Sequence, residues 1–264
     1  MIGFQNLIGT SRVRRKAAVM NSEDSCGTLT WLPVSNYSAR CRYIILKKGL
    51  NIKIEEPTNG MKSPEHLAVS PFGQVPCFQM ENGDAMIESL AIMDYLIDRY
   101  SDVEPRFLPA TPELRARARM ICQVHDFHCG INQGAMYRAM NSPADREVGL
   151  EKIRKGLDVI ELYCEASPFM VGDDLSIADV TVFASSAFYV FMLPRFFGWD
   201  FRDGRPKLAK WFEYMRQESP EAAEVFNTVF KALAAWEKNG RWERLGIQRV
   251  PSFVEAEHEL ISSP

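Results

Sequence analysis

Short apolar runs separated by turns predict a small mixed sheet in the first third of the chain. Runs of β-forming and apolar residues predict strands at 28–33, 51–56, 75–80 and 84–87. The last two are joined by a turn in which Asn82-Gly83 is a strong hairpin signal. Helices are predicted at 39–48, 65–69 and 88–100. This order of strands and helices indicates an α/β domain over residues 28–101.

The pattern becomes helical after a proline-rich segment. Pro105 and Pro109 mark a linker over residues 102–111, because proline lacks a backbone donor and interrupts a helix. Beyond it, long amphipathic stretches predict helices at 113–140, 145–166, 176–193, 206–218 and 220–238. A run of helices with no strand pattern predicts a separate bundle over residues 112–240, followed by an acidic tail over residues 241–264.

Composition and charge exclude several function classes. The chain has 264 residues, 46% apolar and 25% charged, which is the composition of a folded protein. A net charge of −3 gives no electrostatic reason to expect a nucleic-acid or anionic-membrane partner. Residues 180–194 form the longest uncharged apolar stretch, which is short for a membrane span. Six cysteines without a CxxC pair indicate free thiols in a reducing compartment.

The first 27 residues are expected to be an extension outside the fold. Residues 1–22 contain four basic residues and no acidic one. Such a segment is typical of an organellar presequence, and equally of a flexible cytosolic terminus. The expected localisation is cytoplasmic, with the chloroplast or mitochondrion as the alternative if this segment directs import.

Two segments carry a family resemblance. Residues 70–100 read SPFGQVPCFQMENGDAMIESLAIMDYLIDRY, and residues 171–183 read VGDDLSIADVTVF. Both resemble the glutathione transferase superfamily, and the resemblance spans residues 28–240. It implies a thioredoxin-like N-terminal domain followed by an α-helical bundle. It also implies glutathione as co-substrate without a metal, an apolar electrophile as acceptor, and a homodimer.

The resemblance assigns five residues to glutathione. Val75-Pro76 opens a strand where proline cannot donate to a sheet ladder, and the family implies a cis bond whose edge pairs with the extended tripeptide. Glu88-Ser89 begins a helix, whose free N–H groups and dipole favour anions. The family places Ser89 at the γ-glutamyl carboxylate, Glu88 at the γ-glutamyl ammonium and Gln74 beside the peptide. Helix capping alone is the structural alternative for Glu88 and Ser89.

The catalytic group is expected in the turn after the first strand. The glutathione thiol is largely protonated at neutral pH, and a hydroxyl that donates to the sulfur favours the thiolate, as does a helix N-terminus. Ser35 is the first candidate because its spacing to Arg40 resembles the serine-type classes, including zeta and tau. Tyr37 is the alternative, and a site without a catalytic hydroxyl also stays open, with Ser38 as a helix cap.

A further segment, residues 106–120, looks similar to the zeta class. The Ser-Ser-Cys turn of that class is replaced here by Ser35-Asn36-Tyr37. This difference argues against an isomerase activity and leaves the class within the superfamily open.

Further expectations concern the edges of the site. Val34, His128 and Asn132 are expected to border the acceptor pocket. Phe72 lies where an exposed loop aromatic of some family members inserts into the partner subunit, and such aromatics are typical interface anchors. The homodimer prediction depends on this residue.

Two other motifs are assigned no catalytic role. Ser176 and Asp179 form an S-x-x-D capping box, which is a structural element. Cys122, His125, His128 and Cys129 suggest a metal, but on a helix residues 122 and 129 are separated by about 10.5 Å along the axis. One tetrahedral ion cannot be held across that distance, and no metal site is predicted.

The predicted function is a glutathione transferase that activates the thiolate for attack on an electrophilic small molecule. The alternatives are glutathione-dependent reduction, ether cleavage or isomerisation on the same fold. A non-catalytic transferase-like module for protein contacts is a third alternative, from a different class.

Overall fold

The N-terminal domain is built on a short mixed sheet. The computed structural model describes residues 26–251, and the expected presequence and the acidic end of the tail lie outside the described residues. The sheet has four strands in the order β2-β1-β3-β4. They are β1 (Thr28–Thr30), β2 (Lys53–Glu55), β3 (Cys77–Gln79) and β4 (Ala85–Ile87). The β1–β2 pair is parallel and the other pairs are antiparallel. β3 begins only after Pro76, because proline has no N–H to give to the ladder.

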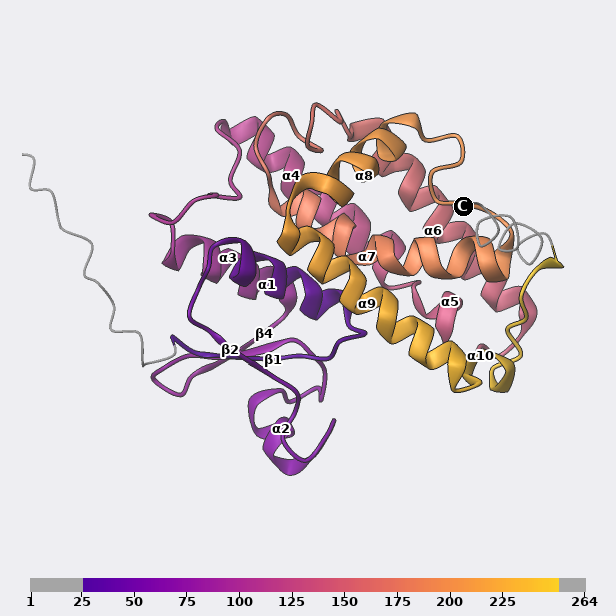
Figure 1. Ribbon diagram of the computed structural model, residues 1–264, viewed down its shortest axis with the longest axis horizontal. Coiled ribbons are helices and arrows are strands. Elements are labelled where there is room, and N and C mark those ends of the chain that lie inside the picture. Colours follow the sequence, from indigo (N-terminus) through magenta and orange to yellow (C-terminus); the bar gives the residue numbers. More distant parts are fainter. Residues whose placement is uncertain (1–25, 252–264) are drawn as a thin grey trace, which may run out of the picture.

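Three helices complete this domain. They are α1 (Asn36–Lys47), α2 (Pro64–Val69) and α3 (Ser89–Arg99). α1 and α3 lie over one face of the sheet, and the short α2 lies on the other side (Figure 1). α1 begins three residues earlier than predicted, because the Ser35 side chain accepts a hydrogen bond from the Ser38 N–H at 3.1 Å and caps the helix. The predicted thioredoxin-like domain is confirmed.

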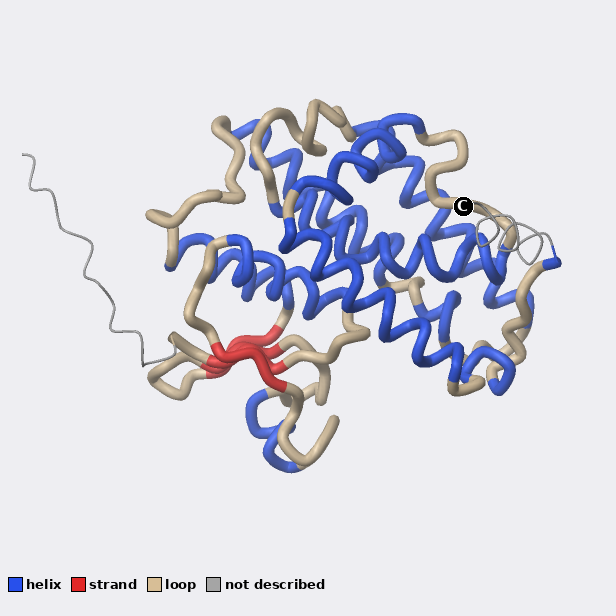
Figure 2. Tube along the Cα trace, in the orientation of Figure 1, coloured by secondary structure: helices blue, strands red, loops and turns tan. Residues whose placement is uncertain are grey.

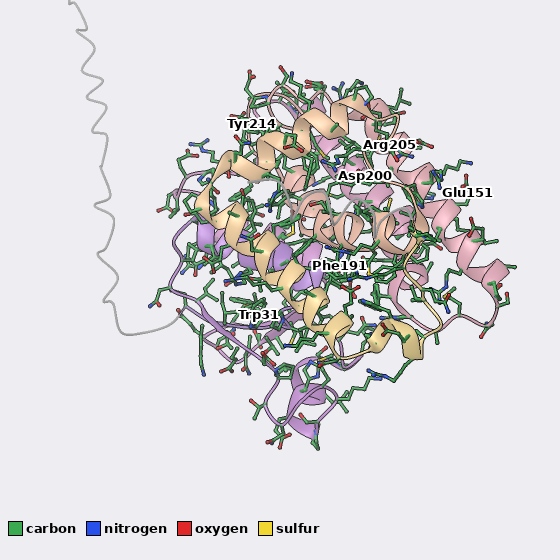
Figure 3. All side chains as sticks on the ribbon, turned by 45° about the vertical axis from the view of Figure 1, so that its right-hand side comes forward. Trp31, Glu151, Phe191, Asp200, Arg205 and Tyr214 are labelled. Carbon is green, nitrogen blue, oxygen red and sulfur yellow. The ribbon has the colours of Figure 1, made fainter. Side chains whose placement is uncertain are left out.

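The rest of the described chain is helical, which confirms the predicted bundle (Figure 2). Its elements are α4 (Pro112–Val124), η1 (His125–Gly130), α5 (Gly134–Tyr137), α6 (Pro143–Tyr163), α7 (Ile177–Met192), η2 (Leu193–Phe197), α8 (Pro206–Glu218), α9 (Pro220–Lys238) and α10 (Arg241–Arg244). The helices pack against one another around α7, whose Phe191 is marked in Figure 3.

The long helix predicted at 113–140 is interrupted in the structure. α4 passes into the π-helical segment η1, and a turn then leads to the short helix α5. A π-helical turn contains more residues than an α-helical one and therefore rotates the side chains that follow it onto a different face. The periodicity of apolar residues cannot reveal this change, because it is compatible with either type of turn.

The central helix α7 is apolar on nearly all sides. Together with η2 it forms a continuous segment of 21 residues, Ile177–Phe197, in which an 18-residue window has a mean hydropathy of 1.5, and by length and composition alone this segment is enough to cross a membrane. The helical segment extends beyond the uncharged residues 180–194 on both sides, so its length alone does not exclude a span. However, 89% of the apolar window is buried inside the fold, which is the position of a core helix.

The N-terminus of α7 carries the capping box of Ser176 and Asp179. The fully buried Asp179 carboxylate accepts hydrogen bonds from the Ser176 N–H at 2.9 Å and from the Ser176 hydroxyl at 2.7 Å. It also accepts from the Met170 N–H and from the Trp211 indole N–H, both at 2.8 Å. The box therefore joins α7 to the preceding loop and to α8.

The helical domain extends beyond Gly240, where the sequence predicts a separate tail. Trp242 on α10 is fully buried, and its ring lies 5.8 Å from that of Phe196 and 6.0 Å from that of Trp236. A four-residue helix is too short to show a periodic pattern, so the packing of Trp242 was not predicted.

The two domains meet along α1. This helix packs against α3 in its own domain and against α7 and α9 in the helical domain. Its N-terminus therefore lies at the junction of the two domains, where the candidate site is found.

Candidate active site

An open cavity of about 950 Å³ lies between the two domains. The N-terminal domain contributes the turn before α1, the loop before β3 and the start of α3. The helical domain contributes residues of η1, α5, α7 and α9. We refer to this space as the interdomain cavity. Clefts of this size at a domain junction are the usual position of small-molecule sites.

The five residues assigned to glutathione all line the interdomain cavity. They are Gln74, Val75, Pro76, Glu88 and Ser89. The bond between Val75 and Pro76 is cis. Ser89 is the first residue of α3, and Glu88 precedes it with φ +70°, a backbone conformation that non-glycine residues rarely adopt. Such conformations are concentrated at functional sites.

Two residues that the sequence did not single out hold the loop before Pro76. The Ser70 hydroxyl donates to the Gln74 carbonyl at 2.8 Å, and the Gln74 N–H donates to the same hydroxyl oxygen at 3.2 Å. The buried His66 accepts the Lys62 N–H at Nδ1 (3.0 Å), so its Nε2 carries the hydrogen and donates to the Gln74 carbonyl at 3.2 Å. The backbone at Gln74 is therefore fixed from two sides.

Ser35 lies at the cavity and at the N-terminus of α1 at once. Its oxygen accepts the Ser38 N–H, and a hydroxyl that accepts one hydrogen bond still has its own hydrogen to donate. The helix dipole adds partial positive charge at this end of α1. A thiolate adjacent to Ser35 would meet both a donor and the positive end of the helix.

Tyr37 also lines the cavity, on the side of the helical domain. A Cβ atom added at Gly130 would lie 2.5 Å from the Tyr37 hydroxyl oxygen, so the absence of a side chain at Gly130 permits this close approach. Burial raises the pKa of Tyr37 to about 12, and the phenol therefore stays protonated at neutral pH. Tyr37 can donate a hydrogen bond but does not act as a base.

A buried arginine lies beneath the glutathione side of the cavity. The fully buried guanidinium of Arg40 donates to the Ser89 hydroxyl at 3.3 Å and to both carboxylate oxygens of Asp126, at 2.5 and 3.0 Å. It also lies 3.1 Å from His125 Nδ1. Arg40 thus joins the start of α3 to η1 in the other domain. Asp126 was missed by the sequence analysis, although it is the only acidic residue between Glu113 and Asp145.

The charges in this network determine its protonation. Burial disfavours the charged form of Asp126, but the hydrogen bond from His125 and the charge of Arg40 outweigh it and hold the pKa of Asp126 well below its usual range. Burial lowers the pKa of His125, which is neutral at pH 7 and contacts the Tyr189 hydroxyl through Nε2 at 3.1 Å. The buried cation and its carboxylate therefore neutralise one another.

Aromatic side chains from both domains line the cavity. Besides the exposed Phe72 and Phe127, they are Tyr37, Tyr137, Phe188 and Trp236, which come from α1, α5, α7 and α9. The Tyr137 ring lies 5.2 Å from the Phe188 ring and 6.2 Å from the Trp236 ring, measured between centroids. We refer to these four residues as the aromatic wall.

The structure corrects part of the acceptor-pocket prediction. Val34 lines the interdomain cavity, but His128 and Asn132 do not. The π-helical turn of η1 brings other residues of this segment to the cavity instead, among them Phe127 and Ile131. Asn132 donates to the His128 carbonyl at 2.8 Å, within its own segment.

The cysteines and histidines of this segment also do not converge. Cys122 contacts the Thr181 hydroxyl at 3.3 Å, Cys129 donates to the Ile153 carbonyl at 3.7 Å, and His125 belongs to the Arg40 network. Within residues 26–251, no group of three His, Cys, Asp or Glu side chains is arranged to hold a metal ion. All six cysteines are free, as predicted, and all six are buried.

Phe72 lies at the mouth of the cavity with 68% of its surface exposed. The partner subunit that would cover it stays a prediction.

Comparisons with known proteins agree with this architecture. Residues 29–105 match the family described as glutathione S-transferase, N-terminal domain, and residues 112–213 match the family described as glutathione S-transferase, C-terminal domain. Glutathione S-transferase 3 from Zea mays is 28% identical over 160 residues, which are 56% of this chain and 71% of that protein. Maleylacetoacetate isomerase from Pseudomonas aeruginosa is 33% identical over 104 residues, or 36% of this chain and 48% of that protein.

A solved structure gives the same result for the fold. The crystal structure of a glutathione S-transferase from Methylobacterium radiotolerans in complex with glutathione sulfonate has a TM-score of 0.65 at 20% identity, covering 76% of this chain and 94% of that one. Both domains match their family descriptions in the order found here, and together the matched residues make up more than half of the sequence. The chain therefore belongs to the glutathione S-transferase superfamily.

Proposed function

We propose that the protein joins glutathione, through its sulfur, to an electrophilic small molecule. The observation that carries this proposal is the position of Ser35. Its hydroxyl caps α1 and lines the same cavity as the cis Val75-Pro76 bond and Ser89. One cavity thus combines a peptide edge, a helix N-terminus for a carboxylate and a hydroxyl donor for a thiolate.

The N-terminal domain supplies the residues that would hold glutathione. The backbone of Val75, ahead of the cis proline, pairs with the cysteinyl part of the tripeptide as an added strand would. The N–H groups at the start of α3 and the Ser89 hydroxyl receive the γ-glutamyl carboxylate. Glu88 meets the γ-glutamyl ammonium, and Gln74 lies beside the peptide. These contacts bring the sulfur next to Ser35.

The glutathione thiol is activated by stabilising the negative charge of its thiolate form. Ser35 donates a hydrogen bond to the sulfur and the α1 dipole favours its negative charge, so the bound thiol loses its proton at a lower pH than free glutathione. One charge-assisted hydrogen bond contributes about 1.5 to 3 kcal/mol, which corresponds to roughly one to two pKa units. The thiolate then attacks an electrophile that lies against the aromatic wall.

A titration of bound glutathione tests the role of Ser35. The variant Ser35→Ala is expected to raise the pKa of the bound thiol by about one to two units, with little change in glutathione affinity, because other groups hold the peptide. The matched control is Tyr37→Phe, which deletes the second hydroxyl and keeps the ring. Thiolate absorbance against pH gives the pKa, and calorimetry gives the affinity.

The two variants together decide the assignment. A pKa that is unchanged in Ser35→Ala and raised in Tyr37→Phe transfers the role to Tyr37. If neither variant changes it, no side-chain hydroxyl stabilises the thiolate. Glutathione binding without turnover of any electrophile would instead favour a non-catalytic interaction module.

Isomerisation is a second candidate function, favoured by the 33% identity with maleylacetoacetate isomerase over 104 residues. It would use the same thiolate, which adds reversibly to a double bond and leaves again after rotation. The concentration of glutathione during the reaction distinguishes the two functions. Transfer consumes one glutathione for each product formed, whereas isomerisation leaves the concentration unchanged.

A further inference from the structure

The aromatic wall defines one side of the space that remains for the second substrate. Its four rings come from four different helices, and two of them, Phe188 and Trp236, lie next to the Tyr137 ring. Aromatic rings attract other aromatic rings in stacked or edge-to-face arrangements at centroid separations of about 4.5 to 7 Å. A flat aromatic acceptor therefore fits this side of the interdomain cavity better than a flexible aliphatic chain.

Arg138 is the one basic residue among the described residues that line the interdomain cavity. Among the described residues that line the interdomain cavity, the charged ones are Glu88, Asp126 and Arg138. Glu88 and Asp126 lie on the glutathione side, and the Asp126 charge is paired with the buried Arg40. Arg138 follows directly after the wall residue Tyr137, and its guanidinium carbon lies 5.6 Å from the centroid of the Tyr137 ring. Within residues 26–251 no carboxylate forms an ion pair with Arg138.

The stem of Arg138, the residue that follows α5, lies over the start of that helix. Its Cδ atom would lie 3.3 Å from a Cβ atom added at Gly134, another residue that lines the cavity. The glycine thus lets the stem lie close to the start of α5. The guanidinium lies beside the Tyr137 ring of the aromatic wall, and the Arg138 side chain is exposed.

We infer that the acceptor is an aromatic electrophile bearing a carboxylate, whose ring lies on the aromatic wall and whose carboxylate pairs with Arg138. A guanidinium presents two parallel N–H donors that match the two carboxylate oxygens. This inference rests on the proposed function, because it names the class of the second substrate for the same transfer.

The reaction can be written for an aryl chloride. The glutathione sulfur forms a bond to the ring carbon that carries chlorine, the carbon–chlorine bond breaks, and chloride leaves with the electron pair. The thiol proton passes to solvent. The carboxylate takes no part in these bond changes, so Arg138 acts on binding rather than on the reacting atoms.

The test compares 4-chloro-3,5-dinitrobenzoate with its methyl ester, each corrected for its uncatalysed rate with glutathione. The native protein is expected to prefer the carboxylate. Arg138→Gln is expected to lower kcat/KM for the carboxylate at least about fivefold more than for the ester, mainly through KM, as expected for the loss of one exposed charge-assisted contact. Lys152→Gln, which removes an exposed charge from α6 outside the cavity lining, controls for net charge. Arg138→Lys should restore part of the preference.

A second measurement separates this inference from the proposed function. The glutathione conjugates of the acid and of the ester are prepared chemically, and their affinities are measured by calorimetry. Equal affinities, or a preference that Arg138→Gln leaves unchanged, would overturn the inference even where transfer is rapid. Absence of turnover with both chlorides would overturn the transfer proposal, while an Arg138-dependent preference for the acid conjugate would still support the anion contact.

Discussion

Replacing Arg40 by methionine is the most informative perturbation of the domain junction. Methionine keeps an unbranched apolar stem and removes the guanidinium. The four contacts to Ser89, His125 and the two oxygens of Asp126 are lost together. The Asp126 carboxylate then remains at the junction without a cation, in a setting from which most water is excluded.

The expected loss of folding free energy depends on how deeply Arg40 and Asp126 are buried. Removal of one partner from a buried ion pair costs about 3 to 5 kcal/mol, because the remaining charge is not solvated. The Arg40 side chain is 0% exposed, but that of Asp126 is 20% exposed and can regain some water. We therefore expect a loss at the lower end, about 3 kcal/mol, which is a large part of the roughly 5 to 15 kcal/mol that stabilises a domain.

Urea denaturation at pH 7, followed by far-ultraviolet circular dichroism, measures this loss. A double-mutant cycle with Asp126→Leu isolates the interaction between the two residues. Arg40→Met combined with Asp126→Leu is expected to be more stable than the sum of the single effects predicts, by about 1 to 3 kcal/mol. Arg40→Lys keeps the charge without the planar fork and should fall between the native protein and Arg40→Met.

A change of less than about 1 kcal/mol in the free energy of unfolding of Arg40→Met would show that Arg40 does not stabilise the domain junction, because an unpaired buried charge costs well above that amount. Additive effects in the cycle would show that Arg40 and Asp126 do not stabilise one another. A normal stability accompanied by a higher KM for glutathione would instead limit the role of Arg40 to the Ser89 contact.

Two further predictions concern stability. Asp179→Ala removes the acceptor for Ser176, Met170 and Trp211 and should cost at least about 3 kcal/mol in urea denaturation, since the cap at Ser176 contributes about 1 to 2 and each of the two other abandoned buried donors about 1 to 3. A loss no greater than that of the exposed control Asp174→Ala would contradict this. Because burial lowers the pKa of His125, the unfolded chain binds a proton below about pH 6.5 more readily than the native protein does, so stability should fall as the pH decreases from 6.5. An equal slope in His125→Gln would show that another group is responsible.

The sequence by itself determined the local parts of this protein. The order of strands and helices followed from apolar periodicity. The resemblance to the glutathione transferase superfamily assigned residues such as Ser89 to glutathione; the structure brings them to one cavity, and their binding of glutathione stays a prediction. Capping is also local, because a cap joins residues three positions apart, as Ser176 and Asp179 do. Such contacts form wherever the segment folds, so the sequence is enough to predict them.

Tertiary structure alone decided which distant side chains meet. Arg40 and Asp126 are 86 positions apart, and they pair only because α1 lies beside η1. The π-helical segment η1 leaves no periodic signal in the sequence, and neither His128 within it nor Asn132 after it lines the cavity. The aromatic wall is assembled from four helices that are separate in the chain, and Trp242 is buried by packing rather than by any pattern around it. The physical reason is the same in each case: the free energy of these contacts comes from burial and pairing between elements, which exist only after the domains have packed.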